Sequence, residues 1–256
     1  MLRFSPANVK IESLGKIPAV ASFLANKRKV YSFDLLSGHA CPFANECFSK
    51  AVVKDGKRSI KDGPNTKFRC FSASQEVLFS GVYNLRSGNF EALKKMSLDQ
   101  MVGGITAAMP ANAGIIRIHV GGDFFNQNYF DAWLMVASTR PDMLFYAYTK
   151  SLPYWVNRMA MIPPNFVLTA SRGGRMDKMI DENNLRQSVV VFSEQQAADM
   201  GLEIDHDDSH AANPATRDKS FALLIHGTQP KGSEASEAIK TLKVNGVKYA
   251  YSKAKK

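Results

Sequence analysis

The chain has 256 residues, of which 45% are hydrophobic and only three are cysteines. This apolar content excludes wholesale disorder, and three cysteines are too few for a secreted disulfide scaffold. Lysine and arginine outnumber aspartate and glutamate by 33 to 23, a net charge of +10 that favours an anionic partner such as nucleic acid or a phosphorylated or carboxylated metabolite.

Residues 1–29 form an N-terminal lead. Its apolar run, residues 17–25, is too short to span a bilayer, and the charges around it do not have the layout of a signal peptide. We therefore expect one domain over residues 1–256, a cytoplasmic location and no membrane partner. Residues 243–256 carry five lysines and no acidic residue, and we interpret them as a basic, solvated tail.

Seven short runs rich in β-branched and aromatic residues predict strands. Most are continuously apolar, as is typical of strands buried on both faces of a parallel sheet. The runs are residues 30–36, 67–72, 115–120, 143–149, 166–171, 188–193 and 221–226, with a weaker candidate at 247–251.

Helical patterns separate most of these runs. Ser97 and Gln100 have the spacing of a capping box, and apolar residues at helical intervals follow them. Further helices are expected at 129–137, 152–161, 176–185, 195–200 and 234–242. The alternation predicts an α/β fold, a parallel (β/α) barrel, whole or partial, with an open doubly wound sheet as the alternative. Long irregular loops are expected at 38–66, after the first strand, and at 201–219, before the last strands.

The three cysteines are candidate metal ligands. Cys41 and Cys47 follow the first predicted strand, and Cys70 lies at the end of the second. Structural zinc sites usually take four ligands in close pairs, whereas five and then 22 residues separate these cysteines. We therefore predict that the loop at 38–66 and Cys70 bind a [4Fe–4S] cluster with one iron left open to a ligand. Three unrelated buried thiols are the simpler alternative.

Other candidate site residues follow later strands, whose carboxyl ends meet at one edge of a parallel sheet. Gly121 and Gly122 would let the backbone approach a cofactor, and Asp123 could accept hydrogen bonds from an ammonium or hydroxyl group. Lys150 and Arg172 could bind a carboxylate or a phosphate.

His226 ends a buried strand and completes the candidate catalytic set with Asp123, Lys150 and Arg172. A histidine with a purely structural role is the alternative. The run Asp-His-Asp-Asp-Ser-His at 205–210 could bind a divalent metal, although acidic loops are commonly only solvated. No Walker loop, nucleophile elbow or dinucleotide fingerprint occurs.

Four motifs resemble the phage-encoded gene-product-88-like proteins. They are Cys-Pro-x-Ala-x-x-Cys at 41–47, Ile-His-Val-Gly-Gly-Asp-Phe-Phe at 118–125, Phe-Tyr-Ala-Tyr-Thr-Lys-Ser at 145–151 and His-Gly-Thr at 226–228. The resemblance implies a viral iron–sulfur protein that is distantly similar to radical SAM enzymes.

That more distant similarity implies a barrel whose first loop carries three cysteines. It also implies a Gly-Gly-acid triplet that holds the amino group of S-adenosylmethionine. This chain departs from both features, since it has no C-x3-C-x2-C motif and its triplet ends in Asp123 instead of glutamate.

The predicted function is that of a phage-type [4Fe–4S] protein with an open iron at the barrel mouth. It would act on a small anionic ligand by redox or Lewis-acid chemistry, hydrolase- or lyase-like, in the cytoplasm of the host cell. Radical SAM catalysis is one alternative. Nucleic-acid binding with a structural metal is another, and it rests on net charge alone because the basic residues are scattered along the sequence. The substrate, the reaction class and the oligomeric state stay open.

Overall fold

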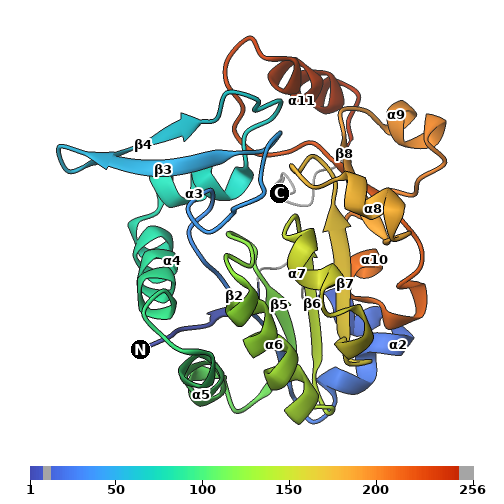
Figure 1. Cartoon of the computed structure of the whole chain (residues 1–256). Helices are drawn as coiled ribbons and strands as arrows, with labels where there is room; N and C mark the ends of the chain where they lie inside the picture. Colours follow the sequence, from blue (N-terminus) through green and yellow to red (C-terminus); the bar gives the residue numbers. More distant parts are fainter. Residues whose placement is uncertain (8–12, 248–256) are drawn as a thin grey trace.

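The structure, a computed structural model, describes residues 1–7 and 13–247 (Figure 1). Seven strands form the main sheet in the order β1-β2-β5-β6-β7-β8-β9. The edge strand β1 (Ser5–Pro6) is antiparallel to its neighbour, and the other pairings are parallel. The parallel strands are β2 (Lys29–Phe33), β5 (Ala113–Ile118), β6 (Leu144–Thr149), β7 (Phe166–Ser171), β8 (Gln187–Val191) and β9 (Phe221–Leu224). The prediction of an α/β fold with a parallel sheet is confirmed.

The parallel strands lie side by side in the same order as they follow one another in the sequence. A doubly wound sheet reverses its strand order at a switch point, and this sheet does not, so the alternative is wrong in its strand order. Among the described residues, no pairing joins β9 back to β1, and the sheet has two free edges.

Six of the seven predicted strands are present, and the prediction of a strand at 67–72 is wrong. This segment is a loop that enters helix α3 (Phe71–Leu78), with Cys70 at the N-cap. Its aromatic residues pack on loops that follow β8 and β9: Phe68 contacts Phe192 edge-on, and Phe71 contacts His226 with the rings tilted. The weaker candidate at 247–251 lies almost wholly outside the described residues.

Two antiparallel strands occupy much of the loop predicted at 38–66. Strands β3 (Ser49–Lys54) and β4 (Lys57–Asp62) form a separate hairpin. Helix α4 (Ser80–Leu93), which no sequence pattern predicted, follows α3 and links the hairpin to the rest of the chain. The predicted loop at 201–219 likewise contains the short helix α10 (Ser209–Ala212) and the 3₁₀ turn η4 (Pro214–Thr216).

The predicted helices are present. Helix α5 (Leu98–Ala108) begins with the expected capping box, in which Ser97 and Gln100 each accept the other's main-chain N–H. The others are α6 (Gln127–Thr139), α7 (Leu152–Val156), α8 (Lys178–Glu182), α9 (Glu194–Asp199) and α11 (Glu234–Val244), with the 3₁₀ turn η3 (Met159–Met161) after α7. Within residues 1–7 and 13–247, no helix is both long enough and apolar enough to cross a membrane.

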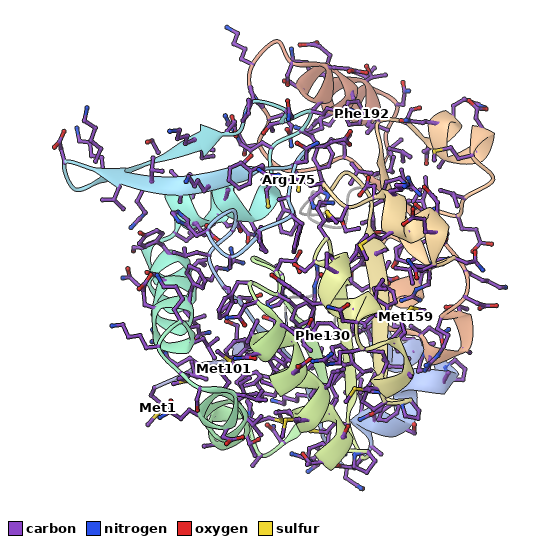
Figure 2. The ribbon with its side chains drawn as sticks, in the orientation of Figure 1. Met1, Met101, Phe130, Met159, Arg175 and Phe192 are labelled. Carbon is purple, nitrogen blue, oxygen red and sulfur yellow. The ribbon has the colours of Figure 1, made fainter. Side chains whose placement is uncertain are left out.

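Helices cover one face of the sheet and the N-terminal lead covers much of the other (Figure 1). On the first face, Phe130, Trp133 and Phe145 belong to the largest core cluster, and Figure 2 shows Phe130 among the packed side chains. On the second face, η1 (Ser13–Lys16), α2 (Pro18–Ala21), η2 (Ser22–Leu24) and α10 pack against the first halves of the strands. There Leu14 and Val20 join a cluster with Ile115 and other strand residues. This packing leaves the carboxyl ends of the strands as the place for a pocket.

Candidate metal centre

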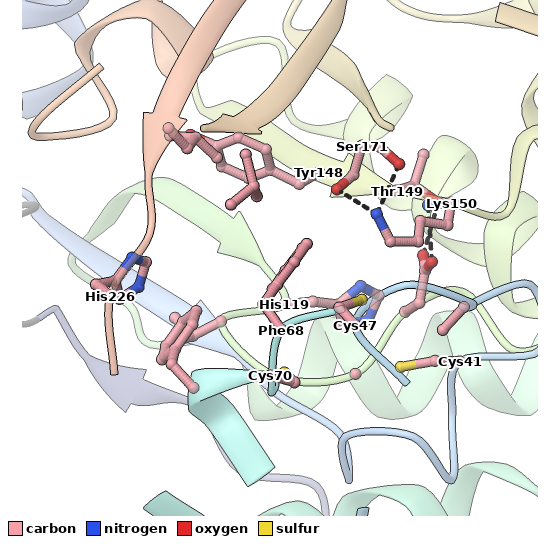
Figure 3. A pocket seen from close by; sticks show the side chains of 18 of the residues that line it. Cys41, Cys47, Phe68, Cys70, His119, Tyr148, Thr149, Lys150, Ser171 and His226 are labelled. Carbon is pink, nitrogen blue, oxygen red and sulfur yellow. Dashed lines mark hydrogen bonds between the residues drawn. The ribbon is translucent and has the colours of Figure 1, made fainter. Parts of the chain in front are cut away.

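A cavity of about 190 Å³ lies at the carboxyl ends of the parallel strands (Figure 3). Its walls come from the loops after β2, β5, β6 and β9, from the end of β7 and from the start of α3. Eight of the nine predicted site residues line it, namely Cys41, Cys47, Cys70, Gly121, Gly122, Asp123, Lys150 and His226. The structure therefore brings together residues that are up to 185 positions apart in the sequence.

Arg172 is the predicted site residue that does not line the cavity. Ser171, the last residue of β7, lines the cavity, and successive side chains of an extended segment point to opposite sides. The Arg172 guanidinium instead pairs with Asp181 of α8 at 2.5 Å. Only its carbonyl oxygen faces the site, where it accepts a hydrogen bond from Lys150 Nζ at 2.7 Å.

The three cysteines are free thiols that enter the cavity from two segments (Figure 3). Burial raises the pKa of the Cys41 thiol well above its ordinary value, and repulsion by Asp123 adds to the shift. Burial, followed by the neighbouring Cys47, raises the pKa of Cys70 to about 11. Burial also raises the pKa of Cys47, although the Lys150 ammonium opposes the shift. In this environment the thiols resist ionisation unless a cation compensates their charge.

Main-chain pairing holds the loop that carries Cys41 and Cys47 against the end of β7. Ala44 forms an antiparallel bridge with Gly174, and the Glu46 N–H donates to the Gly173 carbonyl at 2.9 Å. Gly173 has a φ of +96°, and a Cβ there would lie 2.9 Å from a carboxylate oxygen of Glu46. The sequence Ser-Arg-Gly-Gly-Arg at 171–175, too generic to interpret alone, thus contains the docking edge for this loop.

A second set of contacts holds Cys70. The Gln229 side chain accepts from the Arg69 N–H at 2.7 Å and donates to the Arg69 carbonyl at 3.1 Å. Gly227, with a φ of +82°, packs so closely on Phe71 that a Cβ would lie 2.8 Å from the Phe71 Cβ. The loop after β9 therefore fixes the third cysteine at the start of α3.

Asp123 and Lys150 are both engaged by the protein itself. The Asp123 carboxylate accepts from the Phe124 N–H at 2.7 Å, the Thr149 hydroxyl at 2.6 Å and the Lys150 N–H at 2.9 Å. Burial nevertheless raises the pKa of Asp123 to about 6. Lys150 Nζ donates to the hydroxyl and the carbonyl of Ser171 (Figure 3). These contacts fix the end of β6 beside the cysteines. They also hold the Lys150 ammonium group against the end of β7, in the wall of the cavity.

The glycine pair before Asp123 has a packing explanation. Gly122 has a φ of +90°, and a Cβ there would lie 2.6 Å from the Leu35 Cβ. A Cβ on Gly121 would lie 2.8 Å from the Arg86 guanidinium carbon. The buried Asp34 carboxylate also accepts the Gly121 N–H at 3.2 Å. The pair lets this loop pack against the segment after β2, and it is not by itself evidence of a ligand.

His119 also lines the cavity, and no sequence signal marked it as a site residue. It has a φ of +72°, an uncommon conformation for a residue with a side chain. Burial and the nearby Arg117 lower its pKa to about 3, so the imidazole is neutral. Its Nε2 lies 3.0 Å from the Tyr129 hydroxyl, and within the described residues its buried Nδ1 has no hydrogen-bond partner.

His226 lines the cavity opposite the predicted anion-binding residues. Its Nδ1 lies 3.1 Å from the Leu224 carbonyl oxygen, and its ring packs at a tilt of 41° on Phe71 with the ring centres 4.7 Å apart. These contacts fix the ring orientation beside the segment that carries Cys70.

The acidic run at 205–210 supports the cavity instead of gathering its carboxylates around an ion. Asp208, which lines the cavity, pairs with Arg117 and accepts from the Tyr146 hydroxyl at 2.9 Å. The Asp205 carboxylate accepts the main-chain N–H of His210 at 3.2 Å. Among residues 1–7 and 13–247, no three His, Cys, Asp or Glu side chains are arranged to hold one metal ion.

The fold and the site define the class: an α/β protein with a cysteine-lined pocket at the carboxyl ends of a mostly parallel sheet. A sequence profile of the family described as Gene product 88 matches residues 5–244, nearly the whole chain. The chain therefore belongs to the Gene product 88 family, as its four motifs predicted. Comparisons with curated proteins and with solved structures gave no match.

Proposed function

We propose that this Gene product 88 protein binds a [4Fe–4S] cluster through Cys41, Cys47 and Cys70. The observation that supports the proposal is the convergence of all three cysteines of the chain on one buried pocket. They arrive on two segments, each anchored by its own glycine contacts and hydrogen bonds. Unrelated core thiols would not require such separate anchoring.

The donor set fits a cluster better than a single ion. Three thiolates on one zinc ion lie about 4 Å apart, given Zn–S bonds of about 2.3 Å, and no described group has such an arrangement. In an iron–sulfur cluster each thiolate binds a different iron, which suits more widely spaced sulfurs. When bound, the cluster would supply an electron or, at the iron without a thiolate, a Lewis acid.

The ligand that we propose is small and anionic. A cavity of about 190 Å³ lies below the usual range of about 300–1,000 Å³ for pockets that bind drug-sized molecules. Lys150 contributes positive charge to its wall, where Asp208 balances the charge of Arg117. Phe68, Phe71 and Ile225 contribute apolar surface that excludes water. The Nδ1 of neutral His119, which has no hydrogen-bond partner among the residues that the structure describes, could exchange a hydrogen bond with the ligand.

We also propose that the sheet is a partial (β/α) barrel related to that of radical SAM enzymes. The sequential strand order supports this architecture. The loop with Cys41 and Cys47 follows β2, and the Gly-Gly-Asp loop follows its neighbour β5, so the two motifs lie side by side. A phage origin and the host cytoplasm as its location follow from the family resemblance.

Radical SAM catalysis is the second candidate, and the position of Asp123 favours it. Asp123 lines the same cavity as Cys41 and Cys47, and its charge helps to raise the pKa of both thiols. A carboxylate there could accept from the ammonium group of S-adenosylmethionine. The small cavity and the three protein donors already bound to Asp123 favour the first candidate.

Iron and acid-labile sulfide analysis of anaerobically purified protein tests the cluster. We expect about four of each per chain, as a [4Fe–4S] cluster requires. Cys41→Ser, Cys47→Ser and Cys70→Ser should each lower the content severalfold. Ser171→Ala, which changes the same cavity without removing a thiol, should retain it. Zinc in place of iron, or no metal in any preparation, would refute the cluster.

Reduction of the iron-loaded protein in the presence of S-adenosylmethionine separates the two candidates. Formation of 5′-deoxyadenosine, lost in Asp123→Asn, would favour radical SAM catalysis. A reduced, intact cluster that forms no such product would favour the first candidate.

A further inference from the structure

The hairpin of β3 and β4 projects from the body of the molecule, with its turn at the far end (Figure 1). The turn residues Asp55 and Gly56 have φ angles of +50° and +72°. An Asp-Gly pair with two positive φ angles is typical of a tight two-residue turn that continues the twist of both strands. The hairpin is thus a regular two-stranded ribbon.

One face of the ribbon packs against the protein. Ser49 and Ala51 are buried on β3, opposite Asp62 and Ile60 of β4. On the same face, the Arg58 Nε donates to a carbonyl of α3 at 3.2 Å. Since side chains alternate along a strand, the intervening residues must lie on the opposite, outer face.

The outer face carries four lysines in two facing pairs. Lys50 is opposite Lys61, and Lys54 is opposite Lys57, with Val52 opposite Ser59 between them. In the part of the chain that the structure describes, no ion pair joins any of these lysines to a carboxylate. Like charges directly opposite each other destabilise a strand pair. The four lysines therefore lower the stability of the hairpin, and a bound polyanion would relieve their repulsion. Lysines also protect exposed strand edges from aggregation, but that role does not require lysines in directly facing pairs.

We propose that the outer face of this hairpin binds the phosphate backbone of duplex DNA. Basic residues that are scattered in the sequence meet here because the antiparallel register places residues 50 and 54 opposite 61 and 57. The proposal does not depend on the cluster, since the cavity lining includes none of the four lysines.

The shape and composition of the ribbon favour duplex DNA among the nucleic acids. The major groove of B-form DNA, about 12 Å wide, admits a two-stranded β-ribbon, whereas that of A-form RNA is deep and narrow. Single strands are usually held by aromatic stacking, and none of the paired residues of this face is aromatic. Phe48, just before β3, lies beside the face with its ring centre 5.9 Å from Lys50 Nζ, so that ring is already occupied by a lysine. Only Val52 and Ser59 lie among the lysines, and neither can make a bidentate contact with a base edge. We therefore expect binding with little dependence on sequence.

Fluorescence anisotropy with a labelled duplex of about 20 base pairs tests the proposal. Four phosphate contacts give a slope of about −3.6 for log affinity against log salt, and hence roughly a hundredfold loss between 50 and 200 mM salt. The test variant replaces Lys50, Lys54, Lys57 and Lys61 with glutamine. It should bind at least about tenfold more weakly at low salt and flatten the slope by about three.

The matched control removes the same number of charges elsewhere. It replaces Lys95, Lys219, Lys231 and Lys243, exposed lysines outside the hairpin, with glutamine. This control should bind within about twofold of the parent protein. A double variant at the tip, Lys54→Gln with Lys57→Gln, should show an intermediate loss and keeps the result interpretable if the fourfold variant folds poorly.

Three outcomes would overturn the proposal. The first is no duplex binding by the parent protein at low salt. The second is an equal loss in the hairpin variant and the matched control, which would mean a diffuse charge effect. The third is lysine-dependent binding to vesicles of anionic phospholipid without binding to duplex DNA, which would assign the face to a membrane surface. Iron content measured on the same preparations distinguishes any of these from failure of the cluster proposal.

Discussion

Arg117 and Asp208 form an ion pair in the wall of the pocket, with Nη1 2.5 Å from Oδ2 and the two side chains 9% and 2% exposed. Arg117 belongs to β5, whereas Asp208 belongs to the acidic run that follows β8. The pair therefore ties the loop at 201–219 to the centre of the sheet. The acidic run has a structural role that its composition did not reveal.

We predict that Asp208→Leu lowers the free energy of unfolding by about 3–5 kcal/mol, because it leaves the Arg117 charge buried without this carboxylate. Urea denaturation measures the change. The double variant Arg117→Met/Asp208→Leu should lose less than Asp208→Leu alone. Asp181→Asn, which breaks the more exposed pair with Arg172, should cost less than about 1 kcal/mol. Equal losses in Asp208→Leu and Asp181→Asn would contradict the structural role.

Two glycine substitutions should have opposite effects on stability. Gly122→Ala should be strongly destabilising, by about 3 kcal/mol or more, because it combines a φ of +90° with a Cβ contact of 2.6 Å to Leu35. Gly103 lies inside α5, and a Cβ there has nothing within 4 Å. Gly103→Ala should therefore stabilise the protein by about 0.5–1 kcal/mol. Thermal melts of both variants test this pair, and a harmless Gly122→Ala would show that the loop can relax.

The sequence predicted the parallel strands well because their apolar runs report burial on both faces, as at β5 and β6. It did not predict the hairpin, since β3 and β4 are rich in lysine and lack a continuous apolar run, although the Asp55-Gly56 turn was a usable signal. At residues 67–72 the aromatic side chains that favoured a strand pack against other loops and strands instead.

The sequence predicted those pocket residues that follow a predicted strand. Cys41, Asp123 and Lys150 were found in this way. Arg172 was wrongly assigned to the site because side chains alternate along the chain at the end of β7. Ser171 faces the cavity, so the next side chain, Arg172, lies on the other side and pairs with Asp181. His119 was missed because no residue pattern reveals its positive φ or the lack, among the described residues, of a hydrogen-bond partner for its Nδ1.

Without a bound metal, the three cysteines should have low reactivity. In the folded chain, burial and then the neighbouring Cys47 raise the pKa of Cys70 from 9.0 to about 11. At pH 8 its thiolate fraction is therefore about a hundredfold lower than in the unfolded chain. Iodoacetamide labelling followed by peptide mass spectrometry should show a correspondingly slow reaction of Cys70 in the metal-free protein. Labelling as fast as in concentrated guanidinium chloride would show that the metal-free pocket opens to solvent.

His210 should make stability depend on pH above neutrality. Its Nε2 lies 2.8 Å from a Glu203 carboxylate oxygen, and its Nδ1 lies 3.8 Å from one of Asp205. Asp205 first, and Glu203 with it, raise the pKa of His210 from 6.5 to about 9, whereas partial burial opposes the shift. Because the folded pKa exceeds the unfolded one, the protonated imidazole stabilises the fold. That contribution is complete below pH 6.5 and is lost as the pH rises through 9.

We therefore expect His210→Gln to cost about 1–2 kcal/mol at pH 6, a figure reduced from the full pKa shift because Glu203 is largely exposed. The difference from the parent protein should shrink steadily between pH 6.5 and 9, as measured by urea denaturation at a series of pH values. His206→Gln alters an exposed histidine of the same loop and should change stability little at any pH. A loss in His210→Gln that is the same at pH 6 and pH 9 would mean that the ring acts through packing and not through its charge.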